Sequence, residues 1–218
     1  MSKKKKFEAP YGVETRAYTC ALEARAKESS DSEGIIEGHP IVYGSRTTIM
    51  DTWDEEIEPG ALDACDLKDV MLLVNHNSKE VPLARSRNNT ENSTMQLEVR
   101  EDGLHFRARI DKNNPRGAEL LSAVARGDIT GMSFGFIVGV DHWENLDRDV
   151  PLRRITRIDK VIEVSAVNNP AYEASEISTR SLDCAREALE SEKKALEKAR
   201  EEARTRAEIL KSLCEVKL

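Results

Sequence analysis

Residues 127–136 read GDITGMSFGF, and this stretch decides how the surrounding chain is expected to fold. Alternate side chains of a strand face opposite sides, so Met132 and Phe134 share one face and Ser133 lies on the other. The apolar face belongs in a core, whereas a buried hydroxyl costs free energy unless it finds a partner. Ser133 is therefore expected to face away from the core, beside Gly135, whose missing side chain leaves space for another backbone to approach.

A helix is expected immediately before this strand. Asn114 can cap its first turn, Pro115 suits the first helical position, and Gly127 is a typical stop. The apolar residues between these signals recur at helical spacing: Leu120, Leu121, Val124 and Ala125. The helix delivers the chain directly into the strand that carries Ser133.

Short β-like runs separated by turn residues make up the rest of the central sequence. They are IIEGHPIVYG (35–44), VMLLVNH (70–76), MQLEVRED (95–102), GLHFRARI (103–110), MSFGFIVGVDHW (132–143) and RITRIDKVIEVSAV (154–167). Six or seven strands with one helix among them predict a mainly β fold, with the strands in a closed or nearly closed barrel.

Both ends of the chain depart from this pattern. Residues 24–34, ARAKESSDSEG, have the composition of a linker, so residues 1–33 are expected to be a mobile N-terminal segment, with the folded domain at 34–175. Residues 176–218 contain neither glycine nor proline and predict a long, charged C-terminal helix. Its leucines recur every seven residues, but the companion positions are only partly apolar, so a solvated helix and a helix that pairs with another helical protein both remain open.

Composition excludes several classes of protein. The net charge is −7, and the acidic excess lies in the first 173 residues, so no nucleic-acid partner is expected. No segment resembles a signal peptide or a bilayer span, which predicts a cytosolic protein with no membrane partner. The cysteines and histidines are too far apart in the sequence for a zinc-binding motif, so we expect no metal and no cofactor. The cysteines are expected to be free thiols, and all histidines except His76, which is discussed below, are expected to be structural. The cysteines are Cys20, Cys65, Cys184 and Cys214, and the histidines outside the site are His39, His105 and His142.

Three polar side chains at or near strand ends could form an activated nucleophile. His76 emerges at the end of a buried strand, Ser133 faces out of its strand, and Glu163 lies on the face of the last strand opposite the core. An imidazole can accept a hydroxyl proton near neutral pH, and a carboxylate can orient the imidazole. Spacing alone does not distinguish this trio from three unrelated polar residues.

The order of several segments resembles one family. IIEGHPIVYG, EEIEPGAL, VMLLVNHN followed by VPLARS, ARGDITGMSFGF and RITRIDKVIEVSAVNNPAY occur as in the prohead proteases of tailed phages, the HK97-type capsid maturation proteases, over residues 34–175. The resemblance implies a serine endopeptidase with a fold similar to the herpesvirus assemblins, a β-barrel surrounded by helices. It also implies cleavage of the scaffold, or of a scaffold-like N-terminal segment of the major capsid protein, and of the protease itself, inside the procapsid in the host cytoplasm. The major capsid protein and scaffold segments are then the expected partners, and a homodimer is a further expectation.

Carried over position by position, the resemblance makes His76 the general base and Ser133 the nucleophile. The third member varies in the family between histidine and an acid. No histidine follows His142, so Glu163 in VIEVS is expected to serve, with Asp159, expected on the same face, as the alternative.

Two positions beside the expected base depart from the family pattern. Ala84 stands where glycine is frequent, and Asn77 stands where aspartate is common, but neither change removes a catalytic group. The oxyanion donors stay unassigned, although Arg153 or Arg154 could act through water as basic residues do in the assemblins.

The alternative function is that of a non-enzymatic assembly protein. The barrel would then be a binding domain, and the helical tail would be a scaffold element that directs capsid subunits. If the chain is instead a protease, residues 176–218 are expected to tether it to helical scaffold or capsid segments and to be lost by self-cleavage. Proteolysis that depends on Ser133 discriminates between the two.

Overall fold

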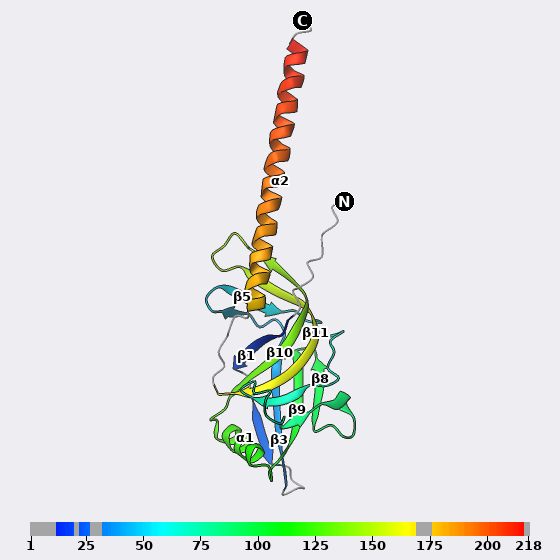
Figure 1. Cartoon of the computed structure of the whole chain (residues 1–218), viewed down its shortest axis with the longest axis vertical. Coiled ribbons are helices and arrows are strands. Elements are labelled where there is room, and N and C mark those ends of the chain that lie inside the picture. The colour runs from blue at the N-terminus through cyan, green and yellow to red at the C-terminus, as the bar shows by residue number, and fades with distance from the viewer. Residues whose placement is uncertain (1–11, 20–21, 27–31, 169–175, 216–218) are drawn as a thin grey trace. The chain divides into compact units, whose positions relative to one another are not determined.

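The computed structural model describes residues 12–19, 22–26, 32–168 and 176–215 (Figure 1). The chain divides into two compact units, residues 1–179 and 180–218. The expected boundary after residue 175 borders residues 169–175, which lie outside the described part. The strands and the candidate site all belong to the first unit.

One mixed sheet of seven strands contains the longest strands of the chain, β10 and β11, which form a bent antiparallel hairpin (Figure 1). β11 also pairs in parallel with β5 through its first residues and with β6 through its last. The members are β1 (Glu14–Thr19), β4 (Thr47–Ile49), β5 (Trp53–Ile57), β6 (Met71–Val74), β7 (Ala84–Arg85), β10 (Gly131–Glu144) and β11 (Leu152–Val167). β11 therefore pairs with three other strands of this sheet, β10, β5 and β6.

A second sheet is antiparallel throughout and has the order β2-β3-β9-β8. Its strands are β2 (Glu23–Ala26), β3 (Glu33–Val42), β8 (Met95–Arg100) and β9 (Gly103–Asp111). One apolar core unites the two sheets, because Phe106 of β9 belongs to the same buried cluster as Phe134 and Phe136 of β10. Met132, Phe134, Phe136 and Val138 of β10 lie in the core as predicted. Ser133 and Gly135 on the alternate face are buried as well, so the expected alternation of burial is not observed here.

The expected barrel is not what the strand pairing forms. Neither sheet closes on itself through the described strands, and β11 changes partner from β5 to β6 along its length. In the described part of the first unit one α-helix accompanies the strands, with a short 3-10 helix at η1 (Arg87–Asn89), instead of a surrounding set of helices. The mainly β prediction is confirmed, whereas the closed barrel is not detected.

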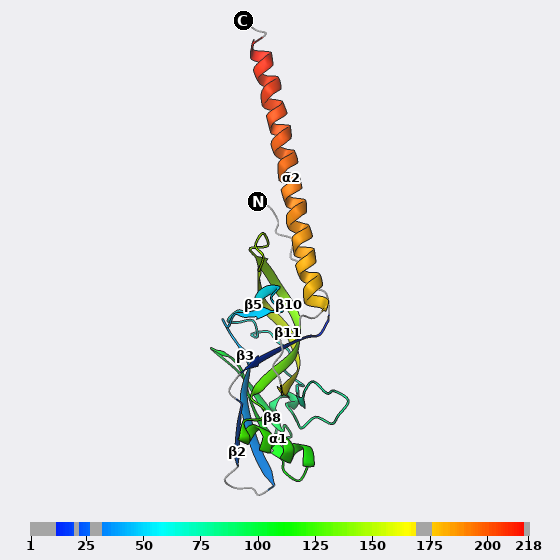
Figure 2. The same cartoon turned by 90° about the vertical axis from the view of Figure 1, so that its left-hand side faces the viewer.

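The helix before β10 is the one that the sequence predicts. α1 (Pro115–Arg126) begins with the side chain of Asn114 accepting a hydrogen bond from the N–H of Arg116, and Gly127 follows in a left-handed conformation with φ 78°. α1 packs beside β2, β3 and β9 (Figure 2). A glycine in β3, Gly34, makes the close approach possible, since an added Cβ there would lie 2.6 Å from the Leu121 side chain.

The N-terminal part of the chain differs from expectation. β1 and β2 lie within residues 1–33, yet β1 pairs with β10 and β2 pairs with β3. The charged composition suggested a linker, but two of these charges are buried in ion pairs. Arg16 pairs with Glu14 and Glu55, and Glu14 also pairs with Arg153. The described part of this segment belongs to the sheets and not to a linker.

The predicted C-terminal helix is present as α2 (Glu176–Glu215). Its side chains are exposed from residue 190 to residue 207, and Leu196 is 53% exposed. Whether it acts alone or pairs with another helix stays a prediction. Among the described residues, no helix combines the length and the apolar character that a membrane span requires.

Two cysteines can be placed in the described structure. Cys65 and Cys184 are free thiols, as expected. Burial raises the pKa of the Cys65 thiol to about 12, which makes it a poor nucleophile near neutral pH. The side chains of Cys20 and Cys214 lie outside the described part.

Candidate active site

His76 lies in the turn that follows β6. Asn75 and His76 both have left-handed backbone conformations, with φ 51° and 57°, which fold the chain back at the end of the strand. Two hydrogen bonds attach this turn to β11: the N–H of Asn75 donates to the carbonyl of Ala166 at 2.9 Å, and the N–H of His76 donates to Oγ of Ser165 at 3.2 Å. The imidazole is therefore held beside the last residues of β11.

Glu163 lies on β11 opposite Gly135 of β10. An added Cβ on Gly135 would be 2.8 Å from Oε1 of Glu163 and 3.2 Å from its Cγ. The space beside Ser133 that the sequence suggested for an approaching backbone is thus occupied by the Glu163 side chain. This is a correction to the expected role of the glycine.

His76 and Glu163 are in direct contact. Nδ1 of His76 lies 2.6 Å from Oε1 of Glu163, and the two side chains are 33% and 9% exposed. An ionised carboxylate can only accept, so Nδ1 is the donor in this contact, and in the neutral ring the lone pair then lies on Nε2. That arrangement leaves the imidazole able to act as a base through Nε2.

Ser165 completes the contacts around the acid, and the sequence reasoning missed it. Its buried hydroxyl donates to Oε2 of Glu163 at 2.5 Å, while its oxygen accepts the N–H of His76. The signal that could have found it is its place two residues after Glu163, which puts both on one face of the strand.

Ser133 lies one strand away, directly opposite Ser165 in the β10–β11 pair and opposite Ala17 in the β1–β10 pair. It is fully buried, and its hydroxyl donates to the main-chain carbonyl of Arg16 at 2.8 Å. Ser133 and His76, which are both described, form no hydrogen bond with each other in this arrangement. Their strands flank β11, so about 10 Å separates the two backbones in the sheet.

The alternative acid, Asp159, is in a different environment. Its carboxylate is exposed, bonds Nε of Arg157 at 2.8 Å, and lies over Gly139 of β10. Glu163 lies over Gly135 and Asp159 lies over Gly139, four residues further along β10, so the two acids occupy separate places along the hairpin. His76 is paired with Glu163 and not with Asp159.

Both arginines that the sequence suggested as oxyanion helpers are engaged by carboxylates. Arg153 is buried and bonds Glu14, Glu55 and Asp141, while Arg154 bonds Glu56 and Glu144. Burial alone would raise the pKa of Glu55, but the guanidiniums of Arg16 and Arg153 outweigh it and hold that pKa below its ordinary value. The contacts give these arginines a structural role, and the oxyanion donors remain unassigned.

A groove of about 760 Å³ flanks the His76 turn. Its lining includes Asn75 and Asn77, which precede and follow His76, and Leu120, Ala123 and Arg116 of α1. Glu80 forms an ion pair with Arg116 in this groove. A peptide chain therefore has room beside the turn, although His76, Ser133 and Glu163 do not themselves line the groove.

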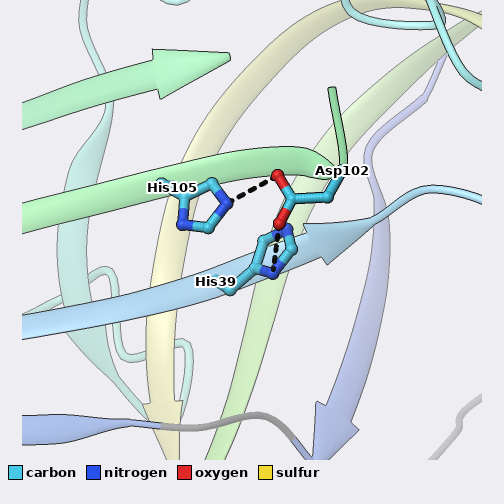
Figure 3. Close-up of side chains that lie close together, drawn as sticks. All are labelled: His39, Asp102 and His105. Carbon is cyan, nitrogen blue, oxygen red and sulfur yellow. Dashed lines mark hydrogen bonds and ion pairs between the residues drawn. The ribbon is translucent and has the colours of Figure 1, made fainter. Parts of the chain in front are cut away.

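A second cluster of titratable side chains lies on β3 and around the β8–β9 turn (Figure 3). Asp102 bonds Nε2 of His105 at 2.8 Å, and its other oxygen lies 3.9 Å from Nδ1 of His39. Two imidazoles and a carboxylate are zinc ligands by type. The rings are stacked, however, with centroids 3.9 Å apart and planes 19° from parallel, so their in-plane lone pairs do not converge on one point. We assign the cluster a structural role in tying β3 to the turn.

Comparison with known proteins adds independent information. The family model of the caudovirus prohead serine proteases matches residues 20–188, which include the segments of His76, Ser133 and Glu163. The prohead protease of Enterobacteria phage HK97 is 28% identical over 150 residues, which cover 67% of this chain and 60% of that protein's length. The solved structure of the bacteriophage T4 capsid assembly protease aligns with 72% of this chain and 99% of its own, at 13% identity and a TM-score of 0.37.

Proposed function

We propose a function from the premise that this chain belongs to the caudovirus prohead serine protease family. The chain is a serine endopeptidase of phage procapsid maturation, and it cleaves the scaffold or a scaffold-like N-terminal segment of the major capsid protein, and itself. The observation that carries the proposal is the 2.6 Å contact between Nδ1 of His76 and Glu163, one strand away from Ser133.

The three side chains have distinct roles in the proposed reaction. Nε2 of His76 takes the proton of the Ser133 hydroxyl as Oγ attacks the scissile carbonyl carbon, and the imidazolium then gives that proton to the leaving amine. Glu163 keeps the ring in the required tautomer and stabilises its positive charge. Water hydrolyses the acyl-enzyme in the second half of the reaction, with His76 again acting as the base.

The Ser133 hydroxyl has to leave its present partner before the chemistry. The Ser133 hydroxyl donates to the carbonyl of Arg16, so it must turn from that acceptor towards Nε2 of His76 before it can lose its proton. Rotation about one side-chain torsion moves Oγ without unpairing β10 from its neighbours. A substrate chain in the groove beside the His76 turn also requires that Ser133, which is fully buried and does not line the groove, become accessible to the scissile carbonyl.

The proposed setting is the interior of the assembling procapsid in the host cytoplasm. The partners are the major capsid protein and scaffold segments. We also propose that the two sheets, which share one apolar core, correspond to the β-barrel of the assemblins.

Co-expression with the major capsid protein of the same phage tests the function. Ser133→Ala is expected to abolish cleavage of the capsid protein and of this chain while leaving incorporation into particles intact, because the nucleophile is lost and the fold is retained. N-terminal sequencing of the products locates the cleaved bonds.

The matched control is Ser86→Ala. Ser86 is equally buried, and its hydroxyl bridges the N–H of Val70 and the carbonyl of Leu67. Its removal is expected to lower stability without stopping cleavage. Undiminished cleavage by the Ser133→Ala chain would reject the protease assignment in favour of a non-enzymatic assembly protein that uses the exposed helix α2.

A further inference from the structure

The carboxylate of Glu163 is held by more than its own backbone. A glutamate side chain has three torsions, so its position on β11 alone does not determine where the oxygens lie. Each oxygen nevertheless has one partner: Oε1 bonds Nδ1 of His76 at 2.6 Å, and Oε2 accepts the Ser165 hydroxyl at 2.5 Å. The Ser165 oxygen also accepts the main-chain N–H of His76 at 3.2 Å. One buried hydroxyl thus connects the acid to the turn that carries the base.

Gly135 supplies the surface on which the carboxylate lies. Its backbone has no left-handed conformation, so an alanine could adopt the same strand geometry. The obstacle to an alanine is the Glu163 side chain, with Oε1 at 2.8 Å and Cδ at 3.4 Å from the added Cβ. A carboxylate at the end of a flexible side chain can move aside, so the added methyl would displace the acid with little effect on the sheet.

We infer that Gly135 and Ser165 are positioning residues that hold the Glu163 carboxylate against His76. This inference rests on the proposed function and deepens it, since it names what fixes the acid of that site. Ser165 acts by a hydrogen bond to Oε2, and Gly135 acts by having no side chain where Oε1 lies. Neither residue touches the reacting atoms.

A displaced acid slows the reaction without abolishing it. Misplacement of a catalytic group by about 1 Å can reduce a rate by about 100-fold. Gly135→Ala and Ser165→Ala are therefore expected to reduce the reactivity of Ser133, because His76 would no longer be held in one orientation. A substitution that only destabilised the fold would lower the melting temperature and leave the reactivity of the folded protein unchanged.

Gly139 provides a matched control on the same strand. An added Cβ there meets the Asp159 carboxylate, which is exposed and can move into solvent. Gly139→Ala adds the same methyl group to β10 but displaces an acid that does not contact His76. Ser165→Thr is the second control, because it keeps the hydroxyl and is expected to restore most of the reactivity that Ser165→Ala loses.

The experiment uses the full chain and needs no knowledge of the substrate. Two quantities are measured: the rate constant for covalent labelling of Ser133 by a fluorophosphonate, and the low-field proton resonance of Nδ1 of His76 in the NMR spectrum. We expect labelling to slow by about 100-fold in Gly135→Ala and Ser165→Ala, with the resonance shifted or lost. Gly139→Ala and the parent should label alike.

The outcomes separate this inference from the proposed function. Parent-like labelling and an unmoved resonance in both Gly135→Ala and Ser165→Ala would overturn the positioning role while leaving the protease assignment standing. A parent chain that is not labelled at Ser133 would overturn the protease assignment and, with it, this inference. Equal slowing in Gly139→Ala would also overturn it, because the effect would then belong to any methyl added on β10.

Discussion

The orientation of the His76 ring follows from its neighbour. The two oxygens of Glu163 each receive a donor, Nδ1 of His76 and the hydroxyl of Ser165. These contacts fix the imidazole with Nδ1 towards the acid, which leaves Nε2 as the ring nitrogen that can face the Ser133 hydroxyl.

Replacing Glu163 tests whether this residue sets the orientation and the tautomer of His76. Glu163→Gln is expected to reduce the cleavage rate constant by about 1,000- to 10,000-fold, because an amide can donate to Nδ1 and so leave the proton on Nε2. Asp159→Asn is the control and should cleave at the parent rate. Kinetics of both variants on one capsid-protein substrate decide the point, and the reverse result would show that Asp159 is the acid.

Some of this chemistry could be predicted from the residues and some could not. His76, Ser133 and Glu163 were named from their strand positions together with the family resemblance. The position of Ser165 two residues after Glu163 was a usable signal, but the role inferred for Gly135 could not be predicted, because it depends on which residues face each other across β10 and β11. That register contains bulges, and no pattern within one strand reveals them.

Among the elements, the sequence was most informative where the apolar pattern was strong. β3, β6, β8, β9, β10 and β11 and the helix α1 lie where alternation and capping signals place them. β1 and β5 were not predicted, since their sequences, ETRAYT and WDEEI, are rich in charge. Glu14, Arg16 and Glu55 are buried because they pair with one another and with Arg153, which a count of apolar residues cannot detect.

The cap of α1 gives a prediction at the level of one element. Asn114→Ala should lower the free energy of unfolding by about 1 kcal/mol, because the N–H of Arg116 loses its side-chain acceptor. Asn114→Asp keeps an acceptor and should be close to the parent. Urea unfolding followed by circular dichroism measures both, and an unchanged midpoint in Asn114→Ala would contradict the capping role.

The whole molecule depends on an ionic network that joins β1 to the rest of the first sheet. Arg16 and Arg153 are fully buried and share Glu14 and Glu55 between them. Removing one partner of a buried pair leaves an uncompensated charge, which typically costs about 3–5 kcal/mol. The N-terminal strand, which forms one flank of β10 at Ser133, is thus attached by this network in addition to its backbone pairing with β10.

Acid should weaken this network. Burial opposes ionisation of Glu55, but the two guanidiniums lower its pKa below the ordinary 4.5, so it contributes stability above that pH. This stability is lost as the pH falls through the lowered pKa of the folded state. The free energy of unfolding, measured by urea titration at a series of pH values, should therefore decline below pH 4.5.

Glu55→Gln is the control for this assignment. The variant should be less stable than the parent at neutral pH, and its stability should fall less steeply in acid, because the titrating group is gone. A parent and a variant with the same slope below pH 4.5 would show that another carboxylate is responsible.

The attack of one particular hydroxyl, activated by one particular imidazole, is the event on which the whole proposal depends. The most direct measurement is peptide mapping by mass spectrometry of the full chain after treatment with a fluorophosphonate. We predict a single adduct on Ser133 that does not form in His76→Ala. An adduct on Ser165 or another serine, or equal labelling of Ser133 without His76, would contradict it.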